Sequence, residues 1–126
     1  MVFYFAVLVK EMNRKYSLKK NHEIEKLFKD KLSVGNKFYA IYYQIITDVN
    51  PKIAFSISKR IKTAVLRNYE KRITKEIFRN KLKSLENLKM LVVVKAAAND
   101  LTYLEKEMQI SYLIKKILRR KNEETN

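Results

Sequence analysis

The fold is decided by two consecutive segments, IAFSISKR at residues 53–60 and AVLRNYEKR at residues 64–72. In the first segment, large apolar side chains alternate with small ones, which is the two-residue period of a β-strand. The large residues are Ile53, Phe55 and Ile57, and the small ones are Ala54, Ser56 and Ser58. The strand therefore has one face that can pack against a core and one that can form the floor of a groove.

The second segment starts a helix that we predict from about residue 61 to residue 83. Two stripes of residues recur at every fourth position on this helix and lie roughly 200° apart. The apolar stripe is Val65, Tyr69, Ile73 and Ile77, and the cationic stripe is Arg67, Lys71, Lys75 and Arg79. We expect the apolar stripe to pack against the sheet and the cationic stripe to face solvent.

Upstream of these segments, the sequence predicts a short helix and a strand. Asn21 can cap a helix in which Ile24, Leu27 and Phe28 recur at helical spacing. Residues 36–47 are rich in aromatic and β-branched side chains, which favours a strand with apolar groups on both faces. One face carries Phe38, Ala40 and Tyr42, and the other carries Tyr39, Ile41, Tyr43 and Ile45.

Downstream, the sequence predicts a buried strand and a last helix. Residues 90–95 begin with a continuous apolar run, which is typical of a strand that is covered on both faces. Thr102 and Glu105 have the spacing of a capping box, so the last helix should begin near Tyr103. Its apolar set is broad enough to lie over a sheet and comprises Leu104, Met108, Ile110, Tyr112, Ile114 and Ile117. The predicted order is helix, strands, helix, strand, helix in an α+β domain.

The charge of the chain indicates a polyanionic partner. Lysine and arginine number 28 against 13 aspartate and glutamate, which gives the 126 residues a net charge of +15. Nucleic acids and membrane headgroups are both polyanionic, so the charge alone does not separate them. The absence of cysteine excludes disulfides and thiolate metal sites, and it favours the reducing cytoplasm.

The opening run MVFYFAVLV is apolar, but it lacks the flanks of a signal peptide and is too short to span a bilayer. We expect residues 1–15 to be an extension that is disordered, or not translated if synthesis begins at Met12. Residues 16–118 should form the domain, and residues 119–126 a polar tail. No membrane association is expected.

The sequence contains no recognisable catalytic or metal-ligating pattern. Its single histidine, His22, lies among polar residues beside the predicted helix cap, and the aspartates at positions 30, 48 and 100 fall in predicted loops or helix ends. Hydrolysis by a polypeptide needs a nucleophile with a base, paired carboxylates or a set of metal ligands. We therefore expect another molecule to supply any chemistry in which this chain takes part.

The two quoted segments resemble the signature of the bacterial ribonuclease P protein component family, which has roughly the form F/L-S-V-S-K-K, a short gap and A-V-x-R-N-R-x-K-R. Further blocks match in order at residues 18–21, Phe28, residues 33–36 and residues 91–94. The resemblance covers roughly residues 16–118. Because several blocks match with similar gaps between them, the resemblance is more specific than a single short motif.

The chain departs from the family pattern at three positions of this region. Tyr69 stands where the second Arg of RNR is usual, Lys62 stands where Gly is usual, and Glu70 adds a negative charge. Tyr69 also lies on the predicted packing stripe, so we expect it in the core or in a cleft wall and not on a phosphate. Together these departures predict a locally weaker affinity for RNA.

The resemblance implies a single-domain α/β sandwich, like domain 2 of ribosomal protein S5, with a left-handed βαβ crossover. It also implies a subunit of ribonuclease P, the endoribonuclease that removes the 5′ leader from precursor tRNA. In this family the catalytic groups belong to the ribonuclease P RNA and act with Mg²⁺, which the RNA and the substrate bind. We expect one protein per RNA in the cytoplasm.

Site residues are carried over by matching positions. The predicted RNA contacts are Lys59, Arg60, Arg67, Asn68, Lys71, Arg72 and Lys75, with Arg79 added from the cationic stripe. The predicted leader cleft comprises Ile24, Phe28, Ala40 and Tyr42, with Phe38 and Ser56 added from the face pattern of the strands. Aromatic rings in such a cleft can stack on bases without requiring a particular sequence. Core packing is an equally good interpretation of Phe28.

Other interpretations remain open. A ribosomal or other general RNA-binding protein with no role in cleavage would share the charge, the size and the absence of a catalytic pattern. The cationic stripe could also be no more than a solvated face. Among these interpretations, only the ordered blocks of the family signature favour ribonuclease P.

Overall fold

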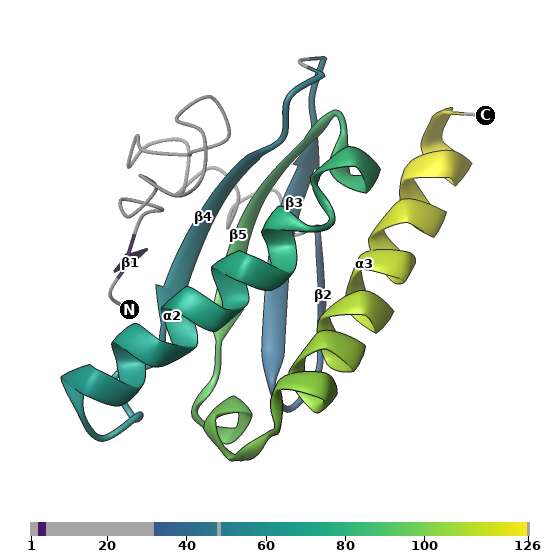
Figure 1. Ribbon diagram of the computed structural model, residues 1–126. Coiled ribbons are helices and arrows are strands. Elements are labelled where there is room, and N and C mark those ends of the chain that lie inside the picture. Colours follow the sequence, from purple (N-terminus) through teal and green to yellow (C-terminus); the bar gives the residue numbers. More distant parts are fainter. Residues whose placement is uncertain (1–2, 5–31, 48, 126) are drawn as a thin grey trace.

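The computed structural model describes residues 3–4, 32–47 and 49–125. The predicted helix that Asn21 caps lies outside these residues, and so do Ile24 and Phe28 of the predicted cleft. The described part consists of a sheet with helices packed against it (Figure 1).

The sheet has five strands in the order β1-β4-β5-β3-β2. They are β1 (Phe3–Tyr4), β2 (Ser33–Gly35), β3 (Tyr39–Ile45), β4 (Lys52–Ile57) and β5 (Leu88–Val94). β4 and β5 are parallel, and the other pairs are antiparallel. The strands predicted at residues 36–47, after Pro51 and at residues 90–95 are therefore confirmed, whereas β1 and β2 were not predicted.

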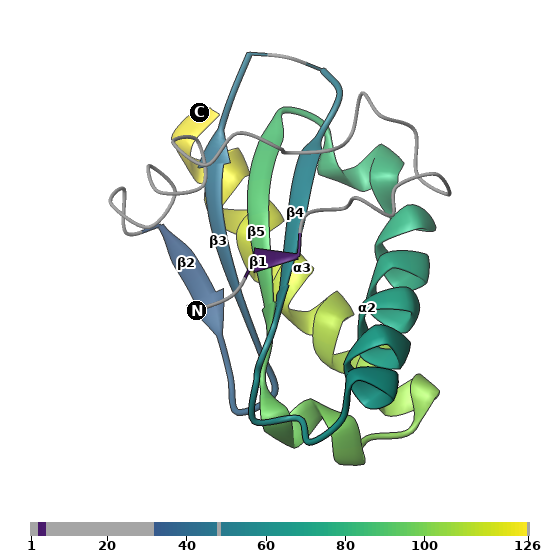
Figure 2. The same ribbon diagram turned by 90° about the vertical axis from the view of Figure 1, so that its left-hand side faces the viewer.

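The helical elements are α2 (Ala64–Arg79), η3 (Leu82–Leu85), η4 (Ala96–Asp100) and α3 (Tyr103–Thr125). α2 contacts β4 and α3 contacts β2 and β3, and both contribute to one core on the same face of the sheet. Figure 2 shows α2 standing beside β4 on that side. α3 continues to Thr125, so helical structure extends into the residues that we predict to be a polar tail.

The connection from β4 through α2 to β5 joins two parallel neighbours. In Figure 1, α2 lies in front of the sheet, β4 points downwards and β5 lies to the right of β4. When the view is turned so that the strands point upwards, β5 lies to the left of β4. The crossover is therefore left-handed, as the family resemblance implies, and it departs from the right-handed rule that holds for most such units.

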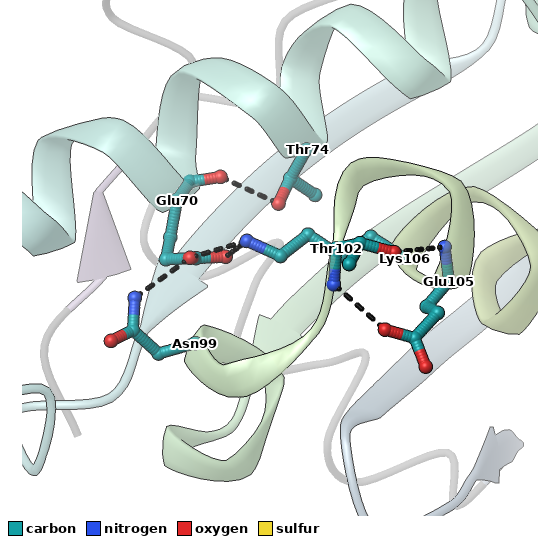
Figure 3. Close-up of polar contacts among 6 residues, drawn as sticks. All are labelled: Glu70, Thr74, Asn99, Thr102, Glu105 and Lys106. Atoms are coloured by element: carbon teal, nitrogen blue, oxygen red, sulfur yellow. Dashed lines mark hydrogen bonds and ion pairs between the residues drawn. The ribbon is translucent and has the colours of Figure 1, made fainter.

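Local sequence explains where the two long helices begin. The Thr63 hydroxyl accepts a hydrogen bond from the Leu66 N–H at 3.1 Å and so caps α2. At the start of α3, the Thr102 N–H donates to Glu105 Oε1 at 3.0 Å and the Glu105 N–H donates to Thr102 Oγ1 at 3.2 Å. The predicted capping box is confirmed (Figure 3).

The predicted packing stripe of α2 holds at Ile73 and Ile77 but is wrong at Val65 and Tyr69. Ile77 is buried beside Phe78, whose ring meets that of Phe55 edge-on at 5.8 Å, but Val65 is 77% exposed. A helix advances about 100° per residue, so a stripe with a four-residue period rotates by roughly 40° per step. Over the three steps from Val65 to Ile77 the rotation is about 120°, which turns the start of the stripe away from the sheet.

The apolar set of α3 divides between two faces. Ile110, Ile114 and Ile117 are buried as predicted, together with Leu113. Leu104, Met108 and Tyr112 are exposed, contrary to the prediction that they lie over the sheet. Positions 108 and 110 differ by roughly 200° around a helix, so one flat sheet cannot cover both series.

Candidate nucleic-acid interface

A cavity of about 780 Å³ lies on the face of the sheet opposite α2 and α3; we call it the sheet cavity. Its floor comes from three adjacent strands, because Ser56 of β4 pairs with Val93 of β5, which pairs with Ala40 of β3. All three side chains are small or of medium size, and they leave room above the strands. Tyr42 adds an aromatic ring to the wall.

The structure brings together Ala40, Tyr42 and Ser56 of the predicted leader cleft, all of which line the sheet cavity. Phe38 does not join them. It precedes the first residue of β3, so it does not follow the alternation of the strand, and it packs against the hydrophobic core. Its predicted place on the cavity face is therefore wrong.

Cationic side chains surround the floor: Lys37, Lys59, Arg60 and Lys95. None of the described lining residues carries a carboxylate. Lys59 and Arg60 were predicted as site residues from the sequence, whereas Lys37 and Lys95 were not. The two-residue period of a strand could have predicted Lys95, because it lies two positions after Val93 and therefore on the same face of the chain.

The position of Lys95 is fixed by a polar cluster at the β2–β3 turn. Its Nζ donates to the backbone carbonyl of Asn36 at 2.6 Å. Asn36 Oδ1 accepts from the N–H groups of Phe38 and Tyr39 at 2.8 and 2.9 Å, and its amide donates to Gln109 of α3 at 2.8 Å. The cavity rim is thus tied to the helical layer on the other side of the sheet.

A short loop joins the cavity to α2. The Ser58 hydroxyl accepts from the Arg60 N–H at 3.2 Å, and the Ser58 carbonyl accepts from the Ile61 N–H at 3.2 Å. Arg67 reaches back to donate to the Ile61 carbonyl at 2.7 Å. This hydrogen bond stabilises the loop. A guanidinium has five N–H donors, so Arg67 keeps further donors that can bind another ligand. Lys59 and Arg60 are exposed on this loop.

The predicted exposure of the cationic stripe holds at Arg79 but is wrong at Lys71 and Lys75. Lys71 is 9% exposed and Lys75 is 2% exposed, because the side of α2 that carries Thr74 and Phe78 also buries them. Burial lowers the pKa of the Lys71 amine. The outward face carries Asn68 and Arg72 instead. We use the name α2 surface for Lys59, Arg60, Arg67, Asn68, Arg72 and Arg79.

Glu70 points inward, so its charge does not face the α2 surface. Its carboxylate accepts from Lys106 Nζ at 2.6 and 2.8 Å and from the Asn99 amide at 2.9 Å, and both charged side chains are buried (Figure 3). This ion pair joins α2 to α3 and to η4, whose Ala96 and Ala97 line the sheet cavity. The expectation that Glu70 weakens RNA affinity by its charge therefore has no geometric basis.

Tyr69 lies on the surface, which makes its predicted place in the core or a cleft wall wrong. The residue is 38% exposed, and its ring lies 4.9 Å from Lys106 Nζ and 6.0 Å from the Arg72 guanidinium. The ring thus covers the Glu70–Lys106 ion pair and contributes an aromatic group beside Arg72.

The described part of the chain has neither a candidate metal site nor a candidate membrane span. It contains no cluster of three or more His, Cys, Asp or Glu side chains that could hold a metal ion. No helix in the described ranges is both long and apolar enough to cross a bilayer.

Comparisons with known proteins identify the family. A family model described as Ribonuclease P matches residues 12–118. The ribonuclease P protein component of Acholeplasma laidlawii is 37% identical over 106 residues, which cover 82% of this chain and 91% of that protein. The corresponding protein of onion yellows phytoplasma is 40% identical over 99 residues, which cover 76% of this chain and 70% of that protein.

Solved structures agree with these matches. A mutant of the Staphylococcus aureus RNase P protein has a TM-score of 0.78 at 26% identity, covering 88% of this chain and 96% of the other. The RNase P protein of Thermotoga maritima shares the fold, with a TM-score of 0.70 at 17% identity and coverage of 79% and 94%.

A cationic cavity beside an arginine-bearing helix defines a protein that binds a polyanion. The chain belongs to the ribonuclease P protein component family. Its role is that of the protein component of the ribonuclease P endoribonuclease, in tRNA processing, and its partner is the ribonuclease P RNA.

Proposed function

We propose that the sheet cavity holds the single-stranded 5′ leader of precursor tRNA while the α2 surface binds the ribonuclease P RNA. One observation carries this proposal: a floor of small residues is surrounded by cations, with no carboxylate among the described lining residues. Small floor residues leave space for bases, and amines and guanidinium groups attract phosphates. Tyr42 offers a ring for stacking, which accepts any base.

The α2 surface is suited to a structured RNA. Arg60, Arg72 and Arg79 present planar groups that bind phosphate oxygens through two directed hydrogen bonds. The loop at residues 58–61 places Lys59 and Arg60 at the border between the cavity and α2. A leader in the cavity and the catalytic RNA on α2 would therefore meet at this loop, which holds the substrate close to the RNA that cleaves it.

We assign the catalytic groups and Mg²⁺ to the RNA and its substrate. The polar groups that line the sheet cavity are mainly amines, a guanidinium and hydroxyls, which are poor ligands for a hard cation that prefers carboxylate and carbonyl oxygens. The cations of the protein offset the electrostatic repulsion between the ribonuclease P RNA and precursor tRNA. One protein per RNA in the cytoplasm completes the proposal.

Reconstitution tests this function. Cleavage of precursor tRNA by a bacterial ribonuclease P RNA at low Mg²⁺ should increase when the protein is added. Ala40→Leu narrows the floor and Tyr42→Ala removes the ring, so both should weaken the binding of precursor tRNA with a leader, Tyr42→Ala by about fivefold or more. Tyr42→Phe retains the ring and should bind nearly as well as the unchanged protein.

Mature tRNA, which has no leader, is the matched substrate. Its binding to the holoenzyme should be the same for all three variants. Equal losses for both substrates would contradict the assignment of the leader to the cavity, and a failure to stimulate cleavage would contradict the proposed function as a whole.

A further inference from the structure

The second half of α3 carries a row of side chains that belong neither to the α2 surface nor to the sheet cavity. Tyr112, Lys115, Lys116 and Arg119 have the spacing i, i+3, i+4, i+7, so they share one helix face. Three of them are exposed and Lys116 is half-buried. The face that packs on the sheet is a separate series that includes Ile110, Ile114 and Ile117.

Two cations near the end of α3 have structural partners among the described residues. Arg120 donates to the Ser33 carbonyl at 2.8 Å and Lys121 donates to the Glu86 carbonyl at 2.6 Å, which fixes the end of α3 to β2 and to the start of β5. Within the described ranges, no ion pair with a carboxylate is found for Lys115, Lys116 or Arg119.

The helix dipole does not account for the row. Cations are favoured near a helix C-terminus, but the effect is confined to about the last turn. α3 ends at Thr125, so Lys115 and Lys116 lie more than two turns before its end. Three cations on one face also repel each other, by a few tenths of a kcal/mol for each pair four residues apart, unless an anion lies alongside.

Tyr112 indicates what kind of anion fits. Its side chain is 55% exposed and lies at one end of the cationic row. The Lys116 amine lies 4.7 Å from the ring centroid, which places a positive charge directly beside the ring. An exposed ring next to phosphate-binding cations is the combination that binds single-stranded nucleic acid, because the base stacks while the cations bind the backbone.

We propose that Tyr112, Lys115, Lys116 and Arg119, which we call the α3 surface, form a second RNA-binding surface that contacts an unpaired segment. α3 lies over β2 and β3, whereas the α2 surface lies beside β4 and the sheet cavity faces the opposite side. The α3 surface is therefore separate from both. The inference rests on the family's partnership with RNA and is independent of where the leader binds.

The test compares two double variants that remove the same charge. Lys115→Gln with Arg119→Gln changes the α3 surface, and Lys81→Gln with Lys83→Gln changes the segment around η3. Affinity for ribonuclease P RNA alone is measured over a range of salt concentrations. Each lost phosphate contact lowers the log-log slope by about 0.7 to 0.9, so the α3 variant should lower it by about 1.4 to 1.8. The η3 variant should leave the slope unchanged.

A separate pair of variants tests whether the Tyr112 ring stacks on a base. Tyr112→Ala should weaken the binding of RNA by about fivefold or more relative to the unchanged protein. Tyr112→Phe retains the ring and should bind nearly as well as the unchanged protein. Tyr103→Ala removes another exposed ring of α3 and serves as the control. Because these side chains are on the surface, the thermal unfolding temperature should not change, which separates loss of contact from loss of fold.

A second arm identifies the RNA. Precursor tRNA binding is measured on holoenzyme assembled at saturating protein. If the α3 variants lose affinity only for ribonuclease P RNA alone, the α3 surface contacts that RNA. If they lose affinity only for precursor tRNA, the α3 surface contacts the substrate. Equal effects of the α3 and η3 variants in both arms would overturn the inference. Ala40→Leu, measured in parallel, reports on the cavity independently.

Discussion

At the scale of single residues, the buried ion pair between Glu70 and Lys106 has the largest expected effect on stability. Removing both charges from water is costly, and the interaction is favourable only because Lys106 Nζ and the Asn99 amide saturate the carboxylate. Removing the charge of either Glu70 or Lys106 therefore leaves the other charge buried without a counter-ion. The pair also supports the ring of Tyr69 on the surface above it.

Glu70→Gln should lower the free energy of unfolding by about 3 to 5 kcal/mol, because it leaves the Lys106 amine buried without a counter-ion. The double change Glu70→Leu with Lys106→Met removes both charges and should cost less than the single change. Denaturant unfolding of the three proteins measures this. A single variant as stable as the double one would show that the buried amine finds another partner.

Charge at position 72 should matter for RNA binding. Arg72 is exposed on the α2 surface, so Arg72→Ala should lower the log-log salt slope for ribonuclease P RNA by about 0.7 to 0.9. Lys83→Ala, an exposed cation of η3, is the control and should leave the slope unchanged. An unchanged slope for Arg72→Ala would place the RNA contact elsewhere.

At the scale of elements, the start of α3 depends on its capping box. The reciprocal hydrogen bonds of Thr102 and Glu105 satisfy two N–H groups that have no partner within the helix. Thr102→Ala should therefore lower the free energy of unfolding by about 1 kcal/mol. Thr47→Ala, at an exposed position outside the helices, should have little effect in the same denaturation experiment. Equal losses would argue against the capping role.

The capping box also predicts a dependence on pH. Hydrogen bonds from the backbone and side chain of Thr102 lower the pKa of Glu105 from its usual 4.5. The folded state therefore holds the ionised carboxylate more strongly than the unfolded state does. This contribution is complete above pH 4.5 and is lost as the pH falls through the lowered pKa. Glu105→Gln should remove this part of the acid sensitivity in thermal unfolding measured between neutral pH and about pH 2.5.

At the scale of the whole molecule, the sheet has the cavity on one face and the helices on the other. One face carries α2 and α3 and most of the core, and the other carries the cavity. The loop between β4 and α2 joins them, because it provides Lys59 and Arg60 to the cavity and leads directly into the helix. α2 lies beside β4 (Figure 2), and Lys59 and Arg60 belong both to the α2 surface and to the cavity lining.

Several features were predictable from local sequence. The alternation in β4 and the spacing of Thr102 and Glu105 depend on neighbours within a few positions, and both predictions are confirmed. The ordered signature blocks identified the family, which the comparisons establish. The face of β3 that carries Ala40 and Tyr42 also follows from its two-residue period, so most of the described cavity floor was found in advance.

Only the tertiary structure decided which helix faces meet solvent. The outward position of Tyr69, the burial of Lys75 and the exposure of Tyr112 depend on where the sheet touches each helix. A four-residue stripe rotates along a helix of 3.6 residues per turn, so the sequence alone does not show which part of it is covered. Lys37 and Lys95 both line the cavity although they are far apart in the chain, because β3 pairs with β5.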